Sequence, residues 1–379
     1  GGVPDDHTDV FIPAGRPNDP VVSTAGGEAR NITVANGAVL TIDGHALEIE
    51  GSISSNGGIN LINGTLEMNG NSAQNISGSM FTGRTIQNIL ISNNHGVNIT
   101  GINDTLNVSG SLKFGISNAT LTTNGNLNLL SRAGGTANIS DMTAGGLYSN
   151  NQINGDVTVE RFIPNHSKAW QFLAAPTSGQ TINQAWQEGN SPLGNNKPGF
   201  GTIITSNLPG ATGLGFDIAT PSSSGPGLKT YNPSTNNWDG VTNTANPIAN
   251  AGGYMLFVRG DRSVTAFNQA ATDVILRSSG KLYTSGLQAP PVINVGADAF
   301  ASVGNPYASA IDFSKLTRTG GVQDVFYVWD PKLTSGPNSV YGLGGFQTLV
   351  GPGPNYTVIP GGGSFAGGNV AIESGMAFF

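Results

Sequence analysis

Cysteine is absent from this chain of 379 residues, and charged residues make up only 10% of it. Without disulfides, stability has to come from a large buried surface, which a long β array provides. The net charge of −7 is diffuse and no run of Lys or Arg occurs, so nucleic acids and anionic membranes are poor partners. No apolar run approaches the roughly 20 residues that span a bilayer, so the sequence predicts no membrane span.

What the chain does contain is glycine, 56 residues of it, together with a hydrophobic fraction of 37%. A disordered chain combines low hydrophobicity with high charge, so this composition predicts folded structure. Abundant Gly, Asn, Ser and Thr suit many tight turns between short strands. The length allows two or three domains, each with its own core.

A short sequence motif recurs between Asn31 and Leu130. In this motif, alternating apolar residues are followed by a turn that contains glycine. Examples are residues 39–44 (VLTIDG), 47–51 (LEIEG) and 59–64 (INLING). Alternation places every second side chain on one face of a strand, and Asn-Gly or Asp-Gly supplies the turn. Three such strands per coil of about 20–25 residues predict a right-handed parallel β-helix. An antiparallel β-sandwich is the alternative, because Asn-Gly turns also form hairpins.

The pattern predicts an all-β protein in three parts. Residues 1–30 are expected to form an N-terminal cap or lead-in strand, and residues 31–156 a β-solenoid. Residues 157–379 differ in composition, because they contain all four Trp and long Gly/Pro-rich loops. They predict a β-sandwich-like domain. Within it, Thr181 to Glu188 is expected to be a short helix with Thr181 as its N-cap. The apolar ending at Phe379 predicts that this domain is truncated at its C-terminus.

Six motifs after residue 156 resemble those of large secreted surface proteins of Bacteroidota. They are VTVERFIP (157–164), KAWQFLAAP (168–176), TINQAWQ (181–187), GYMLFVRGDR (253–262), VGNPY (303–307) and FYVWD (326–330). The upstream repeat is similar to the β-helical stalk that precedes this module in such proteins. The resemblance covers nearly the whole chain, and it implies type IX export and a place at the cell surface. It implies no known activity.

The charges of the repeat region are scattered, whereas hydrolytic β-helices cluster Asp, Lys or Arg on one face of the coil. Glu48, Glu50 and Glu67 are candidates for stacked carboxylates on neighbouring coils, although a solvated outer face is the favoured interpretation. No nucleophile elbow and no phosphate-binding loop is present. The sequence therefore predicts a protein that is not an enzyme.

Two groups of residues are candidate ligand sites. Trp238, in an expected turn, and Tyr231 are candidates for stacking against carbohydrate. Asp5, Asp6 and Asp9 offer oxygen ligands for calcium, the only ion proposed, although a polar cap is the favoured interpretation. Surface glycans are accordingly one expected class of partner.

The function expected from these features is a non-enzymatic extracellular or cell-surface protein of structural or adhesive type. It is expected to be either a display stalk or a self-assembling subunit of an extracellular fibre. Assembly would use coil ends and the strand-like tail as edges for strand addition, with the tail residues being Ala371, Ile372, Phe378 and Phe379. The alternative function is a carbohydrate-binding module of a larger secreted enzyme.

Overall fold

The computed structural model describes residues 3–165, 167–189, 197–249, 251–284, 292–333, 342 and 344–379. The chain divides into two compact units. Unit 1 comprises Gly1–Glu160 and a later segment that begins at Gly280. Unit 2 comprises Arg161–Ser279 and Ala289–Phe379.

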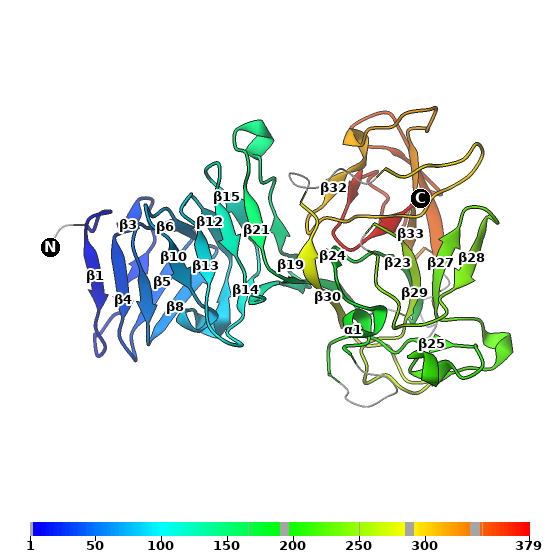
Figure 1. Ribbon diagram of the computed structural model, residues 1–379, viewed down its shortest axis with the longest axis horizontal. Coiled ribbons are helices and arrows are strands. Elements are labelled where there is room, and N and C mark those ends of the chain that lie inside the picture. The colour runs from blue at the N-terminus through cyan, green and yellow to red at the C-terminus, as the bar shows by residue number, and fades with distance from the viewer. Residues whose placement is uncertain are drawn as a thin grey trace. The chain divides into compact units, whose positions relative to one another are not determined.

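Unit 1 is a β-solenoid of about six coils, each made of three short parallel strands (Figure 1). This confirms the predicted all-β solenoid. Successive coils pair strand on strand, so the first strand of one coil bonds to the first strand of the next. In chain order the strands are β1 (Asp9–Ile12), β2 (Val21–Val22), β3 (Gly27–Ala29), β4 (Asn31–Val34), β5 (Val39–Asp43), β6 (Ala46–Ile49), β7 (Ile53–Ser55), β8 (Gly58–Ile62), β9 (Thr65–Met68), β10 (Gln74–Ile76), β11 (Thr85–Ile86), β12 (Asn88–Ile91), β13 (Val97–Ile99), β14 (Leu106–Val108), β15 (Ser111–Phe114), β16 (Thr120–Thr122), β17 (Leu127–Leu129), β20 (Asn138–Ile139), β21 (Gln152–Asn154) and β22 (Val157–Ile163).

The coils begin at Asp9, earlier than the predicted start at Asn31. Asp9 pairs with Asn31 and Ile32 pairs with Ile53, which gives a coil of 21 to 22 residues. The segment expected to be a cap therefore contributes β1, β2 and β3 to the first coil. Its short strands lack the repeated Gly-terminated motif, which is why the sequence pattern missed them.

Apolar side chains stack in columns inside the coils. In one column Leu47 pairs with Leu66, and Leu66 pairs with Ile89. All three are at most 4% exposed. Burying a Leu or Ile side chain contributes about 1.5–3 kcal/mol, so these columns supply the main driving force for the solenoid.

The turns between coils are held by asparagine side chains that reach to the next coil. Asn31 Oδ1 accepts from Ser52 N at 2.7 Å and from Ser52 Oγ at 2.8 Å. Asn88 makes the same pair of bonds with Ser111, both at 2.9 Å. A Cβ on Gly51 would collide with Asn31 Oδ1 and the Arg30 carbonyl oxygen, so glycine is required before this serine. A Gly-Ser pair therefore follows one coil after each of these asparagines: the glycine leaves room for the asparagine side chain, and the serine donates to it.

Three glutamates also stack on consecutive coils, on the outward side of β3, β6 and β9. Glu28 pairs with Glu48, and Glu48 pairs with Glu67. All three side chains are half-buried. Burial raises the pKa of Glu48, and the charges of Glu67 and Glu28 raise it further. Glu50, the third candidate from the sequence, lies outside this ladder, where its Oε1 accepts from Asn71 Nδ2 at 3.4 Å.

Among the described residues, unit 2 contains several short sheets around three apolar clusters. Its largest antiparallel sheet has the order β23 (Ala169–Leu173), β29 (Tyr254–Val258), β27 (Leu228–Asn232), β28 (Asn237–Gly240). A second sheet joins β33 (Val325–Asp330), β34 (Gly345–Val350) and β35 (Thr357–Ile359). This pattern does not confirm the predicted sandwich.

The predicted short helix is present as α1 (Ile182–Trp186). Thr181 is its N-cap, as expected, and it forms a capping box with Gln184. In the part of the chain that the structure describes, no helix has the length and apolar character needed to cross a membrane.

The glutamate ladder makes the solenoid sensitive to pH. Because the pKa of Glu48 is raised in the folded state, protonation of Glu48 contributes to the stability of the fold. This contribution is fully present below the unfolded pKa of about 4.3. This contribution is lost as pH rises through the folded pKa. We expect Glu48→Gln to stabilise the solenoid by about 0.5 kcal/mol at pH 7, since like charges opposite each other on strands are unfavourable. Calorimetry of the full chain at pH 4 and pH 7 measures the change.

Glu50→Gln is the matched control, because it removes the same charge outside the ladder. Its melting temperature should change less at pH 7 than that of Glu48→Gln. Equal shifts in the two variants would contradict a specific effect of the ladder.

Candidate functional site

A cluster of ten aromatic side chains in unit 2 is the first candidate site. It joins the sheet of β23, β29, β27 and β28 to residues of β33, β34 and the C-terminal tail. Most of its rings are half-buried, and Phe300 is 41% exposed. The members are Trp170, Phe172, Tyr231, Trp238, Phe257, Phe300, Tyr327, Trp329, Phe346 and Phe379.

Trp238 and Tyr231, the predicted carbohydrate-stacking residues, both belong to this cluster. Trp238 lies in strand β28 directly opposite Tyr231, whereas the sequence placed it in a turn. The hairpin turn precedes β28, and Asn236 in that turn has a φ of 51°. The two rings are 5.6 Å apart, and Trp238 also packs edge-on against Phe172 at 5.4 Å. Trp238 therefore contributes to packing and remains half-exposed.

Phe379 is the hub of the cluster. Its ring lies 4.6 Å from the ring of Tyr231 and 5.1 Å from the ring of Phe172. Its backbone N–H donates to the carbonyl of Tyr327 at 3.0 Å, and its carbonyl accepts from Tyr327 N at 2.9 Å. Phe379 thus pairs with Tyr327 of strand β33 through two backbone hydrogen bonds, as residues on neighbouring antiparallel strands do.

The rest of the predicted assembly edge is also paired inside unit 2. Strand β36 (Ala371–Ile372) is antiparallel to β32 (Ile311–Asp312). Strand β37 (Ala377–Phe378) is antiparallel to β31 (Val303–Gly304). Ile372 is fully buried and Phe378 is 3% exposed. In this pairing β36 and β37 each bond along one edge to a strand of their own unit, and assembly through this tail stays a prediction.

The three aspartates proposed for calcium do not share one site. The carboxylate of Asp9 accepts from Arg30 Nε at 2.7 Å and from Asn31 Nδ2 at 2.7 Å. These bonds, chiefly those from Arg30, lower the pKa of Asp9 to about 2. Asp5 and Asp6 instead lie near His7, with one ligand atom of each residue within 4.8 Å of the others.

Asp5, Asp6 and His7 are exposed, and their side chains take part in hydrogen bonds with each other and with Thr8. Asp5 Oδ1 accepts from Thr8 Oγ1, and this bond lowers the pKa of Asp5. His7 Nδ1 contacts Asp6 Oδ1 at 2.5 Å, and this bond raises the pKa of His7. Elsewhere among the described residues, no three His, Cys, Asp or Glu side chains converge in a comparable way. Exposed groups like this one are common without a metal.

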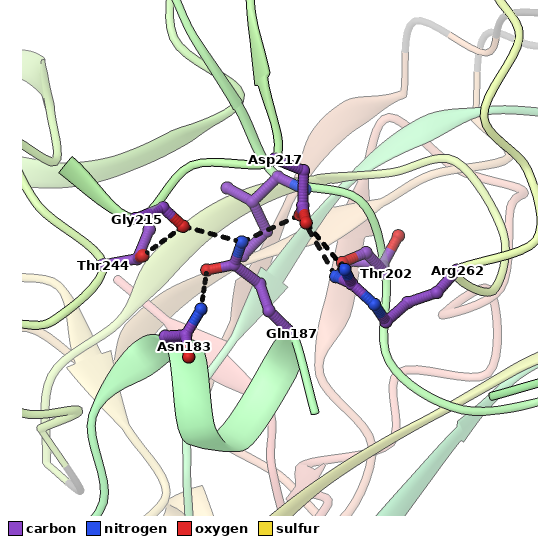
Figure 2. A network of polar contacts seen from close by, with 8 residues as sticks. Asn183, Gln187, Thr202, Gly215, Asp217, Thr244 and Arg262 are labelled. Atoms are coloured by element: carbon purple, nitrogen blue, oxygen red, sulfur yellow. Dashed lines mark hydrogen bonds and ion pairs between the residues drawn. The ribbon is translucent and has the colours of Figure 1, made fainter. Parts of the chain in front are cut away.

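A buried polar network, which the sequence did not reveal, lies next to helix α1 (Figure 2). Arg262 and Asp217 are both fully buried and form a two-pronged ion pair, with Nη2–Oδ1 at 2.7 Å and Nη1–Oδ2 at 3.1 Å. Gln187 Nε2 donates to Asp217 Oδ2 at 2.8 Å. Arg262 Nη1 also donates to the Thr202 carbonyl at 3.2 Å.

The network links segments that are far apart in the sequence, so no local motif could predict it. Gln187 also donates to the Gly215 carbonyl at 3.0 Å, as does Thr244 Oγ1 at 2.7 Å. A charged pair with no exposed surface is out of reach of a substrate. Its role is to hold the end of α1 and the loop at Gly215 in place.

Breaking this ion pair should destabilise unit 2 strongly. Asp217→Leu leaves the Arg262 guanidinium buried without its countercharge, which costs about 3–5 kcal/mol. The double variant Asp217→Leu/Arg262→Met should recover part of this loss, because it removes both charges. Urea unfolding followed by tryptophan fluorescence measures both effects.

The exposed pair of Lys281 and Asp156 serves as the control, since its side chains are 66% and 59% exposed. Lys281→Met should change stability little. A double variant less stable than Asp217→Leu alone would contradict the argument from the uncompensated charge.

Comparison with known proteins identifies no relative for this chain. No family model matches it, and no curated protein or solved structure matches it significantly. The similarity to Bacteroidota surface proteins therefore stays a prediction.

Proposed function

We propose that the chain is a non-catalytic extracellular protein with a structural or adhesive role, whose solenoid serves as a display stalk. The observation that carries the proposal is the use of outward polar side chains as links between coils. Asn98 Nδ2 donates to Asn75 Oδ1 at 3.3 Å, and Asn128 Nδ2 donates to Asn107 Oδ1 at 3.2 Å. Polar groups that a binding or catalytic surface would need are used here to stabilise the stack.

A location at the cell surface is part of this proposal. It is supported by the resemblance of six motifs to those of secreted Bacteroidota surface proteins, a resemblance that also makes type IX export the proposed route. The Cys-free sequence suits it as well, because a stack of buried apolar columns needs no disulfide.

A fibre-forming subunit is the other form of the proposed structural role. Assembly through the C-terminal tail would have to use the edges of β36 and β37 that do not face β32 and β31. The tail pairing therefore favours the display stalk over a fibre assembled through the tail. Sedimentation velocity of the full chain over a range of concentrations distinguishes a monomer from a polymer.

Labelling of intact cells tests the proposed location. Antibodies raised against the full chain should label intact cells of the source organism as strongly as permeabilised cells, because the epitopes lie outside. A cytoplasmic protein in the same samples is the control for cell integrity. Labelling that depends on permeabilisation would contradict an extracellular role.

Carbohydrate binding is the second candidate function, and the position of Trp238 favours it. Trp238 and Tyr231 are half-exposed side by side on one sheet. Aromatic rings of this kind pack against the C–H faces of sugars while their polar edges remain in water. In this function unit 2 would recognise a surface glycan.

A glycan array probed with the full chain tests this second function. Trp238→Ala should weaken binding about fivefold or more, as truncation of a central aromatic contact does. Phe11→Ala is the control, because Phe11 is a 64% exposed ring of unit 1. Thermal melts establish whether Trp238→Ala still folds. An array without binding, or equal losses in both variants, would count against a carbohydrate site at Trp238.

A further inference from the structure

A continuous row of cation, ring, ring and cation lies on the largest sheet of unit 2; we call it the cationic strip. The guanidinium carbon of Arg259 lies 4.9 Å from the ring centre of Phe257. The rings of Phe257 and Trp170 are 5.3 Å apart. The ammonium of Lys229 lies 4.8 Å from the ring centre of Trp170. All four side chains are half-buried, so the strip reaches the surface.

The register of the sheet explains why these side chains meet. Trp170 is the direct cross-strand partner of Phe257, and Lys229 is the partner of Met255, two residues before Phe257. Cross-strand partners project from the same face, and so do residues two apart on one strand. The two aromatic rings therefore lie between the two cations, and each ring holds one of them by a cation–π contact.

The strip is locally positive within an acidic protein of net charge −7. Two carboxylates close in the sequence, those of Asp239 and Asp261, accept hydrogen bonds from other groups. Asp239 accepts from Asn232 at 2.8 Å, and Asp261 accepts from Ser263 N at 2.9 Å and Gly199 N at 2.5 Å. The positive field also acts on Lys168, which is fully buried, because the charge of Arg259 adds to burial in lowering the pKa of Lys168.

The cationic strip continues into the predicted carbohydrate-stacking pair. Tyr231 lies two residues after Lys229 on β27, so the two side chains share a face at a spacing of about 7 Å. Tyr231 in turn pairs with Trp238. The spacing between the Lys229 ammonium-bearing side chain and the half-buried ring of Tyr231 thus corresponds to about one sugar residue with a charged group at one end.

We propose that this face binds an acidic polysaccharide, whose carboxylate or sulfate groups pair with Lys229 and Arg259 while a sugar ring packs on Tyr231 and Trp238. The proposal rests on the carbohydrate-binding function above and names its ligand class. Charge complementarity selects acidic over neutral sugars, and preoriented cations lose less side-chain entropy on binding. Single-stranded nucleic acid is the competing polyanion, and the binding test below includes it.

Binding of defined polymers to the full chain tests the proposal. The probes are alginate and chondroitin sulfate as acidic polysaccharides, dextran as a neutral one, and single-stranded DNA as a different polyanion. We expect both acidic polysaccharides, or one of them, to bind at least about tenfold more tightly than dextran and DNA. Their affinity should fall as salt rises.

Charge variants locate the site. Lys229→Met should weaken binding of the acidic polymer about tenfold, because an ionised hydrogen bond is lost. Lys229→Arg should retain it, which separates lost charge from lost folding. Lys113→Met is the matched control, since Lys113 is an exposed lysine of unit 1 and the change in net charge is the same.

Three results would overturn the proposal: equal affinity for alginate, chondroitin sulfate and dextran, equal affinity for DNA, or equal losses in Lys229→Met and Lys113→Met. Dextran binding that is lost in Trp238→Ala would refute the acidic ligand while leaving carbohydrate binding intact. An absence of binding to every polysaccharide would remove both. The surface labelling described above tests the structural role independently of these outcomes.

Discussion

In-register parallel pairing between coils is the constraint on which the solenoid depends, because it places each side chain directly over the one a coil earlier. The effect of this stacking depends on chemistry. Leu47 over Leu66 buries apolar surface, and Asn107 over Asn128 forms a hydrogen bond. Glu48 over Glu67 brings like charges together. A solenoid therefore favours apolar and amide residues and tolerates few ionisable ones, which accounts for the low charge of the repeat.

Unit 2 is organised by contacts between distant segments rather than by a repeat. Its two largest sheets are antiparallel, and its buried ion pair joins Asp217 to Arg262, 45 residues later. Such a pair is weak evidence for stability in itself, since desolvation offsets much of its attraction. Its value here is geometric, because the same carboxylate also accepts from Gln187 and from the backbone of Ile204. The buried carboxylate of Asp217 thus holds together the end of α1, the segment at Ile204 and the loop that carries Arg262.

The parts that the sequence predicted correctly are those encoded by local pattern. Alternation with Gly-containing turns predicted the solenoid, and Thr181 was recognised as the N-cap of α1. The first coil was missed because β2 has only two residues and no repeat motif. The position of Trp238 and the pairing of the C-terminal tail were also missed. The tail pairs with β31, which lies far earlier in the chain, and periodicity carries no information about such a partner. Trp238 belongs to a local hairpin with the preceding strand β27, and it was missed because the turn lies before it, at Asn236, rather than at Trp238.

The C-terminal tail connects the stability of unit 2 with its exposed aromatic face. Phe379 packs on Tyr231 and Phe172, and its backbone pairs with Tyr327, so the last residue helps to hold the rings at the surface. Residues on a paired strand lose little further freedom when they bind a ligand, which favours recognition by preorganised rings. The same packing ties the tail to its own chain. The proposed role, in which unit 2 presents this face and the solenoid serves as a stalk, therefore makes use of features of both units.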